Sequence, residues 1–255
     1  MIAKLYAMTC GSLMGPYDQL MEGGEGRIRL PIPSFLIEHP KGTALFDTGM
    51  HPELRTNPGR RVSERVLRLF GFEHFGPADD IRSKLAAFDR DPGKIDFIIA
   101  SHFHFDHCGG NEFVPNATLI VQKREWQAAN DPELGPALGF SKLDFDHGHK
   151  VLQVDGEHDV FGDGSVVCIP TWGHTPGHQS LRVRTAKGEV VLTGDACYFC
   201  RTLKERRLPV RVFNREEMHA SLDRLAALEK GGAKLIFGHD ADFWKDVPQA
   251  PVQVF

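Results

Sequence analysis

The sequence has 255 residues, of which 41% are hydrophobic and 25% are charged, and its formal net charge is -4. This length supplies ample material for a core, and no linker divides it, so we expect a single domain over residues 1–255. The slightly acidic balance argues against a nucleic-acid partner, which would favour a basic surface. The first residues lack the apolar core of a signal peptide, and no apolar run approaches the roughly 18 residues of a membrane span. We therefore expect a cytoplasmic protein without a membrane partner.

Short strands and turns alternate through the first part of the chain. Residues 2–8 and 35–38 alternate between apolar and polar side chains, as half-buried strands do, and residues 43–46 form a further strand that ends at a turn. The segment 11–33 is rich in Gly, Pro and Met, and we expect a loop there. Such a loop could wall a pocket, or it could fold onto the core or onto a partner subunit.

Two segments that follow have apolar residues at helical spacing, at residues 62–72 and 81–88. Both are predicted to be helices that cover a sheet.

The densest group of metal-ligand side chains follows a predicted buried strand at residues 95–100. His102, His104, Asp106 and His107 lie within six residues of sequence. While the backbone stays extended, side chains repeat with a period of two, so His102 and His104 point the same way and can hold one ion. Once the chain turns, Asp106 and His107 can face a second position beside the first. The pattern therefore indicates a metal site.

The second half of the sequence predicts further strands and two helices. A strand at 117–122 and a short helix at 124–130 precede an irregular stretch at 131–150. The strands expected to form a second sheet lie at residues 151–154, 166–170, 179–183 and 190–192. The clearest helix, at 216–230, is closed by two glycines and leads to a strand at 234–237. Two β-rich halves with covering helices predict an α+β protein, arranged as a four-layer αββα sandwich.

The pattern His-x-His-x-Asp-His resembles the metal-binding motif of the metallo-β-lactamase superfamily. Three later segments match those that supply further ligands in that superfamily: Gly173-His174, Gly194-Asp195 and Gly238-His239. The resemblance implies the same αββα fold and a dinuclear site. One metal would be held by His102, His104 and His174, the other by Asp106, His107 and His239, with Asp195 bridging the two. The order of these matches along the chain disfavours the alternative, that these are ordinary core histidines.

Two further groups of residues bear on the ligand set. Asp47, in the matching stretch at residues 45–49, would orient a ligand imidazole. His147 and His149 look like an additional ligand pair, but we interpret them as turn histidines because the ligand set is already complete.

A pair of ions implies hydrolysis as the default chemistry. Two ions lower the pKa of a shared water, giving a bridging hydroxide near neutral pH, and they can hold the attacked carbonyl and the departing oxygen. Histidine and carboxylate ligands suit zinc, although manganese, iron and cobalt are also compatible. Asp106 could also carry a proton to the leaving group.

The residues between the ligands resemble those of the N-acyl-homoserine-lactone lactonases, which are quorum-quenching enzymes. The resemblance is carried by His-Thr-Pro-Gly-His-Gln-Ser at 174–180 and by Tyr198, three residues after Asp195. It implies a small lactone as substrate and Tyr198 as a hydrogen-bond donor to the oxyanion. The alternative for Tyr198 is a core tyrosine. Phe105 would line the pocket, and His178 would support the site without binding metal. Related lactonases are often dimers, which raises a homodimer as a prospect.

Three other hypotheses about the function stay open. The stretch 102–111 also resembles 4-pyridoxolactonase, whose polar aromatic lactone would favour cationic contacts, and a thioester is a further candidate substrate. Basic residues that could supply such contacts, or that could form a solvated surface, are Arg201, Lys204, Arg206, Arg207 and Arg211. In a different functional class, the protein could bind metals without catalysing a reaction, as a scaffold or sensor.

The cysteines add little to this choice. Five scattered cysteines argue against a secreted disulfide framework. We interpret Cys197 and Cys200 as idle thiols and not as a redox pair.

Overall fold

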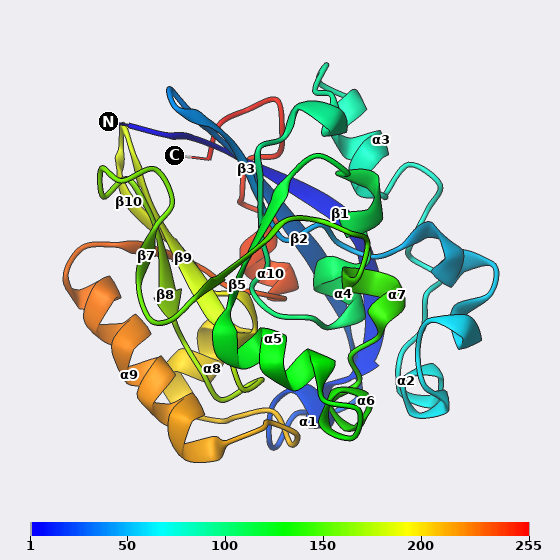
Figure 1. Cartoon of the computed structure of the whole chain (residues 1–255). Coiled ribbons are helices and arrows are strands. Elements are labelled where there is room, and N and C mark those ends of the chain that lie inside the picture. Colours follow the sequence, from blue (N-terminus) through cyan, green and yellow to red (C-terminus); the bar gives the residue numbers. More distant parts are fainter. Residues whose placement is uncertain (1, 255) are drawn as a thin grey trace.

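Two β-sheets form the centre of the protein in a computed structural model that describes residues 2–254 (Figure 1). The first sheet has six strands, and their order in space is their order in sequence. They are β1 (Lys4–Pro16), β2 (Arg27–His39), β3 (Gly42–Phe46), β4 (Phe97–Ile99), β5 (Thr118–Gln122) and β6 (Val151–Val154). Strands β1 to β3 are antiparallel, and β3 to β6 run parallel.

The second sheet has five strands in the order β11-β10-β9-β8-β7. They are β7 (His158–Asp159), β8 (Val166–Pro170), β9 (Gln179–Thr185), β10 (Gly188–Leu192) and β11 (Lys234–Ile236). Only the β10–β11 pair is parallel among the strand pairs of this sheet in residues 2–254.

Helices cover the outer face of each sheet. The α-helices are α1 (Tyr17–Leu20), α2 (Glu64–Leu69), α3 (Ile81–Ala86), α4 (Phe105–Cys108), α5 (Lys123–Asn130), α6 (Leu134–Leu138), α7 (Lys142–Phe145), α8 (Cys200–Glu205), α9 (Arg215–Lys230) and α10 (Ala241–Trp244). Short 3-10 turns lie at Pro52–Arg55, Pro58–Arg60, Pro92–Lys94, Asn111–Phe113 and Gly194–Ala196. None of the helices in the described part of the chain is long and apolar enough to cross a membrane.

Three hydrophobic cores separate the layers. The middle core joins the inner faces of both sheets, with Ile37 and Ile99 from the first sheet and Leu181 and Val190 from the second. A second core lies between the first sheet and its helices, and a third lies between the second sheet and α9. The predicted α+β, four-layer αββα arrangement is therefore confirmed.

The segment 11–33 differs from the expected loop. Most of it extends the β1–β2 ladder, whose pairing continues to Pro16 and Arg27 around the short helix α1. A bulge interrupts the register between Thr9 and Ser12, where Gly11 has φ 87°, a conformation that glycine adopts without strain. The Gly and Pro residues that suggested a loop are accommodated by this bulge and by the turn.

Strand β6 has the predicted residues but belongs to the other sheet. It pairs in parallel with β5, with Val151 opposite Leu119, and so completes the first sheet and not the second. A parallel return needs a long crossover, and this crossover contains α5, α6 and α7. The stretch 131–150, expected to be irregular, therefore holds two short helices.

Candidate metal centre

Four loops deliver the predicted ligand side chains to one place. Strand β4 leads into His102 and His104, and the short helix α4 follows at once with Asp106 and His107. The remaining three residues follow strands of the second sheet: His174 comes after β8, Asp195 after β10 and His239 after β11. Both sheets thus contribute strand ends to one site, as is common where α/β sheets bind ligands.

The first group consists of His102, His104, His174 and Asp195. Each offers one nitrogen or carboxylate oxygen, and these atoms lie within 4.8 Å of one another. The Nδ1 atom of His104 lies 2.9 Å from Nε2 of His102 and 3.0 Å from Nε2 of His174. Three imidazoles therefore converge on one point.

The second group consists of Asp106, His107 and His239, whose ligand atoms meet the same 4.8 Å limit. Asp195 connects the two groups. Its Oδ2 lies 3.2 Å from His174 Nε2, while its Oδ1 lies 3.2 Å from His107 Nε2 and 3.0 Å from His239 Nε2. The two oxygens of one carboxylate thus face different groups, which is the arrangement expected of a bridging ligand.

The donor atoms of the first group suit a divalent cation. Burial lowers the pKa of His102, His104 and His174, so these imidazoles are neutral and have a lone pair for a metal. The surrounding imidazoles outweigh burial and hold the pKa of Asp195 well below its usual value, so this carboxylate is charged. Buried neutral nitrogens around a buried carboxylate form the nitrogen and oxygen set that transition metals bind.

The second group shows the same fit through unpartnered atoms. His107 Nε2 and Asp195 Oδ1 are buried and lie 3.2 Å apart, but they make no hydrogen bond. Buried polar atoms without partners are rare in proteins, and a shared ion accounts for both. The Asp195 carboxylate outweighs burial and raises the pKa of His107 and of His239, so binding of a metal here would release protons.

Asp47 supports His107 from behind, as predicted. Its Oδ2 lies 2.8 Å from His107 Nδ1, and the carboxylate also accepts hydrogen bonds from the backbone N–H and the hydroxyl of Ser101. This contact directs His107 Nε2 toward Asp195. Asp47 has φ 58°, an uncommon value that aspartate and asparagine tolerate best among residues with a side chain.

Glu125 on α5 is a supporting residue that the sequence did not indicate. Its fully buried carboxylate accepts hydrogen bonds from Phe103 N at 3.1 Å, Thr175 Oγ1 at 2.8 Å and Gly177 N at 2.8 Å. Burial outweighs these bonds and raises the pKa of Glu125 to about 7. One side chain therefore ties the loop of His102 and His104 to the loop of His174.

His178 has the supporting position that was expected of it. Its Nε2 accepts a hydrogen bond of 3.0 Å from the backbone N–H of Asp195, and Nδ1 lies 2.9 Å from the Thr171 hydroxyl. Burial lowers the pKa of His178 to about 3, which keeps the ring neutral and able to accept this bond. His178 therefore fixes the backbone of Asp195.

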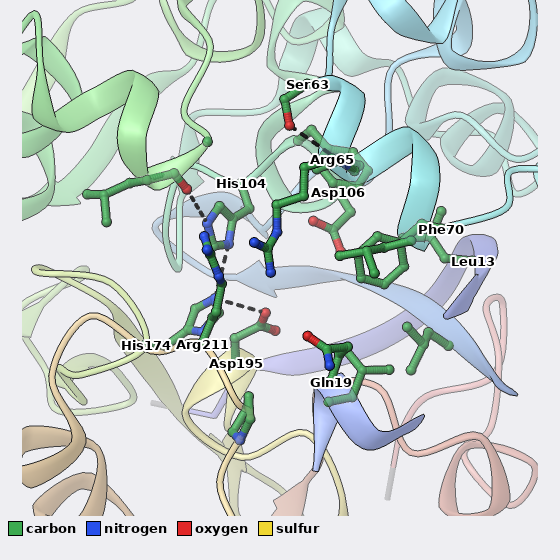
Figure 2. A pocket seen from close by; sticks show the side chains of 18 of the residues that line it. Leu13, Gln19, Ser63, Arg65, Phe70, His104, Asp106, His174, Asp195 and Arg211 are labelled. Carbon is green, nitrogen blue, oxygen red and sulfur yellow. Dashed lines mark hydrogen bonds and ion pairs between the residues drawn. The ribbon is translucent and has the colours of Figure 1, made fainter. Parts of the chain in front are cut away.

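The two groups lie at the base of a pocket of about 250 Å³ (Figure 2). His104, Asp106, His174, Asp195, Tyr198 and His239 all line it. Its walls are largely apolar and come from β1, α1, β2, α2 and α6; they include Leu13, Leu20, Leu30, Val66, Leu69, Phe70 and Leu138. Phe105 lines the pocket as predicted. The segment 11–33 also forms part of its wall, although as strands and a helix.

Comparison with known proteins agrees with this geometry. The family model of the metallo-beta-lactamase superfamily matches residues 27–239. The chain belongs to this superfamily. N-acyl homoserine lactonase AttM of Azorhizobium caulinodans is 33% identical over 268 residues, which cover 97% of each chain. N-acyl homoserine lactonase AiiA of Bacillus thuringiensis subsp. kurstaki is 31% identical over 256 residues, which cover 94% of each chain.

Solved structures of lactonases have a similar fold. An N-acyl homoserine lactone hydrolase with the product N-hexanoyl-L-homoserine bound at its catalytic metal centre has a TM-score of 0.88 and 30% sequence identity, and 100% of each chain is covered. AidC, a dizinc quorum-quenching lactonase, is 17% identical with a TM-score of 0.69, and the alignment covers 99% of this chain and 93% of AidC. At that identity AidC supports the metallo-β-lactamase fold alone.

Tyr198 lies beside both groups of this metallo-β-lactamase site. Its ring centroid is 5.7 Å from that of His174 and 5.2 Å from that of His239, and the side chain lines the pocket. Burial, reinforced by the charge of Asp195, raises the pKa of Tyr198 well above its usual value. The phenol is therefore protonated at neutral pH and can donate a hydrogen bond, with the Asp195 carboxylate as its acceptor within the site.

The basic residues after Tyr198 do not act as one cluster. Three of them form ion pairs with nearby acids: Arg201 and Arg207 with Glu205, and Arg206 with Asp223. Lys204 is exposed. Arg211 lines the pocket.

The remaining sequence candidates lie outside the site. His147 and His149 belong to neither group of candidate ligands in residues 2–254, and His149 Nε2 lies 3.0 Å from the Val114 carbonyl. Cys197 and Cys200 are free thiols, and burial raises the pKa of Cys197, which leaves it unreactive.

Proposed function

We propose that this chain opens the lactone ring of N-acyl homoserine lactones as a dinuclear metal-dependent hydrolase. The observation that carries the proposal is the single carboxylate, Asp195, that faces two groups of ligand atoms at the base of a largely apolar pocket. The similarity to AttM and AiiA supports the same substrate class.

The ligand assignment follows the two groups. His102, His104 and His174 would hold one ion, Asp106, His107 and His239 the other, and Asp195 would bridge them. We propose zinc, because neutral imidazole and carboxylate donors suit it. When bound, such a pair of ions supplies Lewis acidity that activates water and polarises an ester carbonyl.

Three parts of the chain would act on the substrate. The apolar walls hold the acyl chain, and Tyr198 donates a hydrogen bond to the carbonyl oxygen as it gains negative charge. Asp106, whose side chain is 13% exposed in the pocket, takes up a proton and delivers it to the ring oxygen as the ester C–O bond breaks. The products are the ring-opened acyl homoserine and one proton.

Two further properties belong to the proposal. A cytoplasmic location is supported by the five free cysteines of residues 2–254, since reduced thiols persist in the cytosol. A homodimer is proposed from the resemblance to other lactonases, and sedimentation of the purified protein would test it.

The test is proton release at constant pH from metal-replete protein. Homoserine lactones with short and long acyl chains would be supplied, with 4-pyridoxolactone and a thioester in parallel. Efficient opening of the acyl homoserine lactones is expected, and the trend with chain length would size the pocket. Turnover of pyridoxolactone or the thioester alone would overturn the substrate assignment, and no turnover at all would favour a metal-binding scaffold.

A further inference from the structure

Two of the residues that line the pocket are arginines. Arg65 lies on α2, and Arg211 lies between α8 and α9. Figure 2 shows both side chains entering the pocket from these different elements. Across residues 2–254, neither side chain makes a hydrogen bond or an ion pair with the rest of the chain. We call Arg65 and Arg211 the arginine pair.

Neighbouring arginines that do not line the pocket behave differently. Four of them are paired with an acid, and the pairs are Arg68–Glu64, Arg201–Glu205, Arg206–Asp223 and Arg215–Glu22. Arg27 instead donates hydrogen bonds to the backbone carbonyls of Met14 and Leu69. Arg68 shares α2 with Arg65 but is absent from the pocket lining. Arg29 on β2 and Arg182 on β9 also lack such a partner in the described chain, but only Arg65 and Arg211 combine this with a place in the pocket lining.

The metal centre does not account for the arginine pair. Asp106 and Asp195 line the same pocket, but neither forms an ion pair with an arginine in the described chain. Their carboxylates instead lie against the imidazoles of His107, His174 and His239. The negative charges at the base are therefore committed to the ligand cluster.

A neutral aliphatic acyl chain does not account for the pair either. Such a chain offers no acceptor to a guanidinium, and covering a guanidinium with apolar groups costs free energy because its N–H groups lose water. A carboxylate has the opposite effect, since the planar guanidinium matches its two oxygens and the attraction is stronger where water is partly excluded.

We propose that the arginine pair recognises a carboxylate on the acyl group, so that the enzyme prefers lactones whose acyl chain ends in an anionic group. This inference rests on the lactone hydrolysis proposed above, because the arginine pair lines the same pocket. The apolar walls would then hold the middle of the acyl chain, and the arginine pair its charged end.

The test compares two substrates of equal acyl length. N-hexanoyl homoserine lactone has a neutral six-carbon chain, and N-adipoyl homoserine lactone has a six-carbon chain that ends in a carboxylate. The kcat/KM for each would be measured in the wild type, in Arg65→Met and in Arg211→Met. Methionine keeps an unbranched stem and removes the charge. Arg68→Met is the matched control, because it removes an arginine from the same helix outside the pocket.

The wild type is expected to favour the adipoyl substrate. Each pocket variant should lose about tenfold in kcat/KM for that substrate, as expected for a lost hydrogen bond to a charged group, and little for the hexanoyl substrate. Rising salt should reduce the wild-type preference. The control should match the wild type, and all variants should keep its thermal midpoint, since neither arginine of the pair makes a hydrogen bond or an ion pair in the described chain.

Three results would overturn the inference about the acyl charge, and a fourth would remove its basis. Equal loss for both substrates, or no preference and no loss, would show that the arginine pair does not read the acyl charge. A change confined to inhibition by ring-opened N-hexanoyl homoserine would mean that the pair binds the carboxylate formed by hydrolysis. Failure of the wild type to open either lactone would instead remove the proposed function on which the inference rests.

Discussion

The base of the pocket differs in construction from the wall that carries the arginine pair. We call this wall the mouth, because Arg211 is exposed there and Arg65 is half-buried. At the base, buried side chains are braced by other buried groups: Asp47 holds His107, His178 holds the backbone of Asp195, and Glu125 joins two ligand loops. At the mouth, α2 has no fully buried residue, and the arginine pair has no protein partner in the described chain. The difference suggests that the base sets the chemistry, while the mouth sets the substrate preference.

The largest effect should follow removal of a ligand at the base. His104→Ala or Asp195→Ala should lose bound metal and lactone opening together, by more than about a hundredfold in activity, since second-sphere changes alone reach that size. Metal content after dialysis and proton release would be measured on the same samples. Asp223→Ala, an exposed aspartate on α9, is the control and should retain both. Full activity with an empty site would end the dinuclear proposal.

The next effect concerns the brace behind His107. Asp47→Asn keeps the shape and tolerates the backbone at this position, but an amide cannot accept every hydrogen bond that the carboxylate accepts from Ser101 and His107. Metal affinity should fall about ten- to hundredfold. Competition with a chelator would measure this fall. Unchanged affinity would show that the base does not depend on Asp47.

Substitution of Tyr198 distinguishes the catalytic step from metal binding. Tyr198→Phe should lower kcat for lactone opening about ten- to hundredfold, somewhat less than the loss of a full oxyanion-hole donor, and the metal content should stay constant. Steady-state kinetics and metal analysis together would check this. An unchanged kcat would assign Tyr198 a packing role.

The smallest effect on turnover is expected at Glu125, where stability is the more sensitive measure. Its folded pKa of about 7 exceeds the usual value of 4.5, so the folded protein binds more protons than the unfolded chain between these limits. The free energy of unfolding should therefore fall as the pH rises from about 4.5 to about 7, by up to about 3 kcal/mol from this group.

Glu125→Gln removes this titration. The difference in unfolding free energy between variant and wild type, followed by denaturant titration of metal-free protein, should change across that pH range and be constant above it. A constant difference from pH 4.5 to 8 would mean that Glu125 keeps an ordinary pKa.

The sequence was informative about the base because its residues carry local patterns. His102 to His107 are nearly contiguous, and the resemblance supplied His174, Asp195 and His239 in order. Glu125 was missed because a single glutamate in a short helix has no local signature, and its role appears only when two distant loops meet it.

The mouth was harder to predict for a related reason. The arginine pair is separated by more than half of the chain, and only tertiary packing brings α2 and the segment after α8 to one pocket. The sheet to which β6 belongs was predicted wrongly for the same reason. The choice of partner strand depends on the path of the crossover and not on the strand's own residues.

A zinc titration of metal-free protein during lactone opening tests whether hydrolysis depends on two metal ions. Activity should be absent at the start, rise with added zinc and level off at two ions per chain, with N-hexanoyl homoserine lactone as the reporter substrate. Asp195→Ala should show no such rise. Full turnover by the metal-free protein would contradict the proposed dinuclear mechanism, and so would a titration in which metal binds without raising the activity.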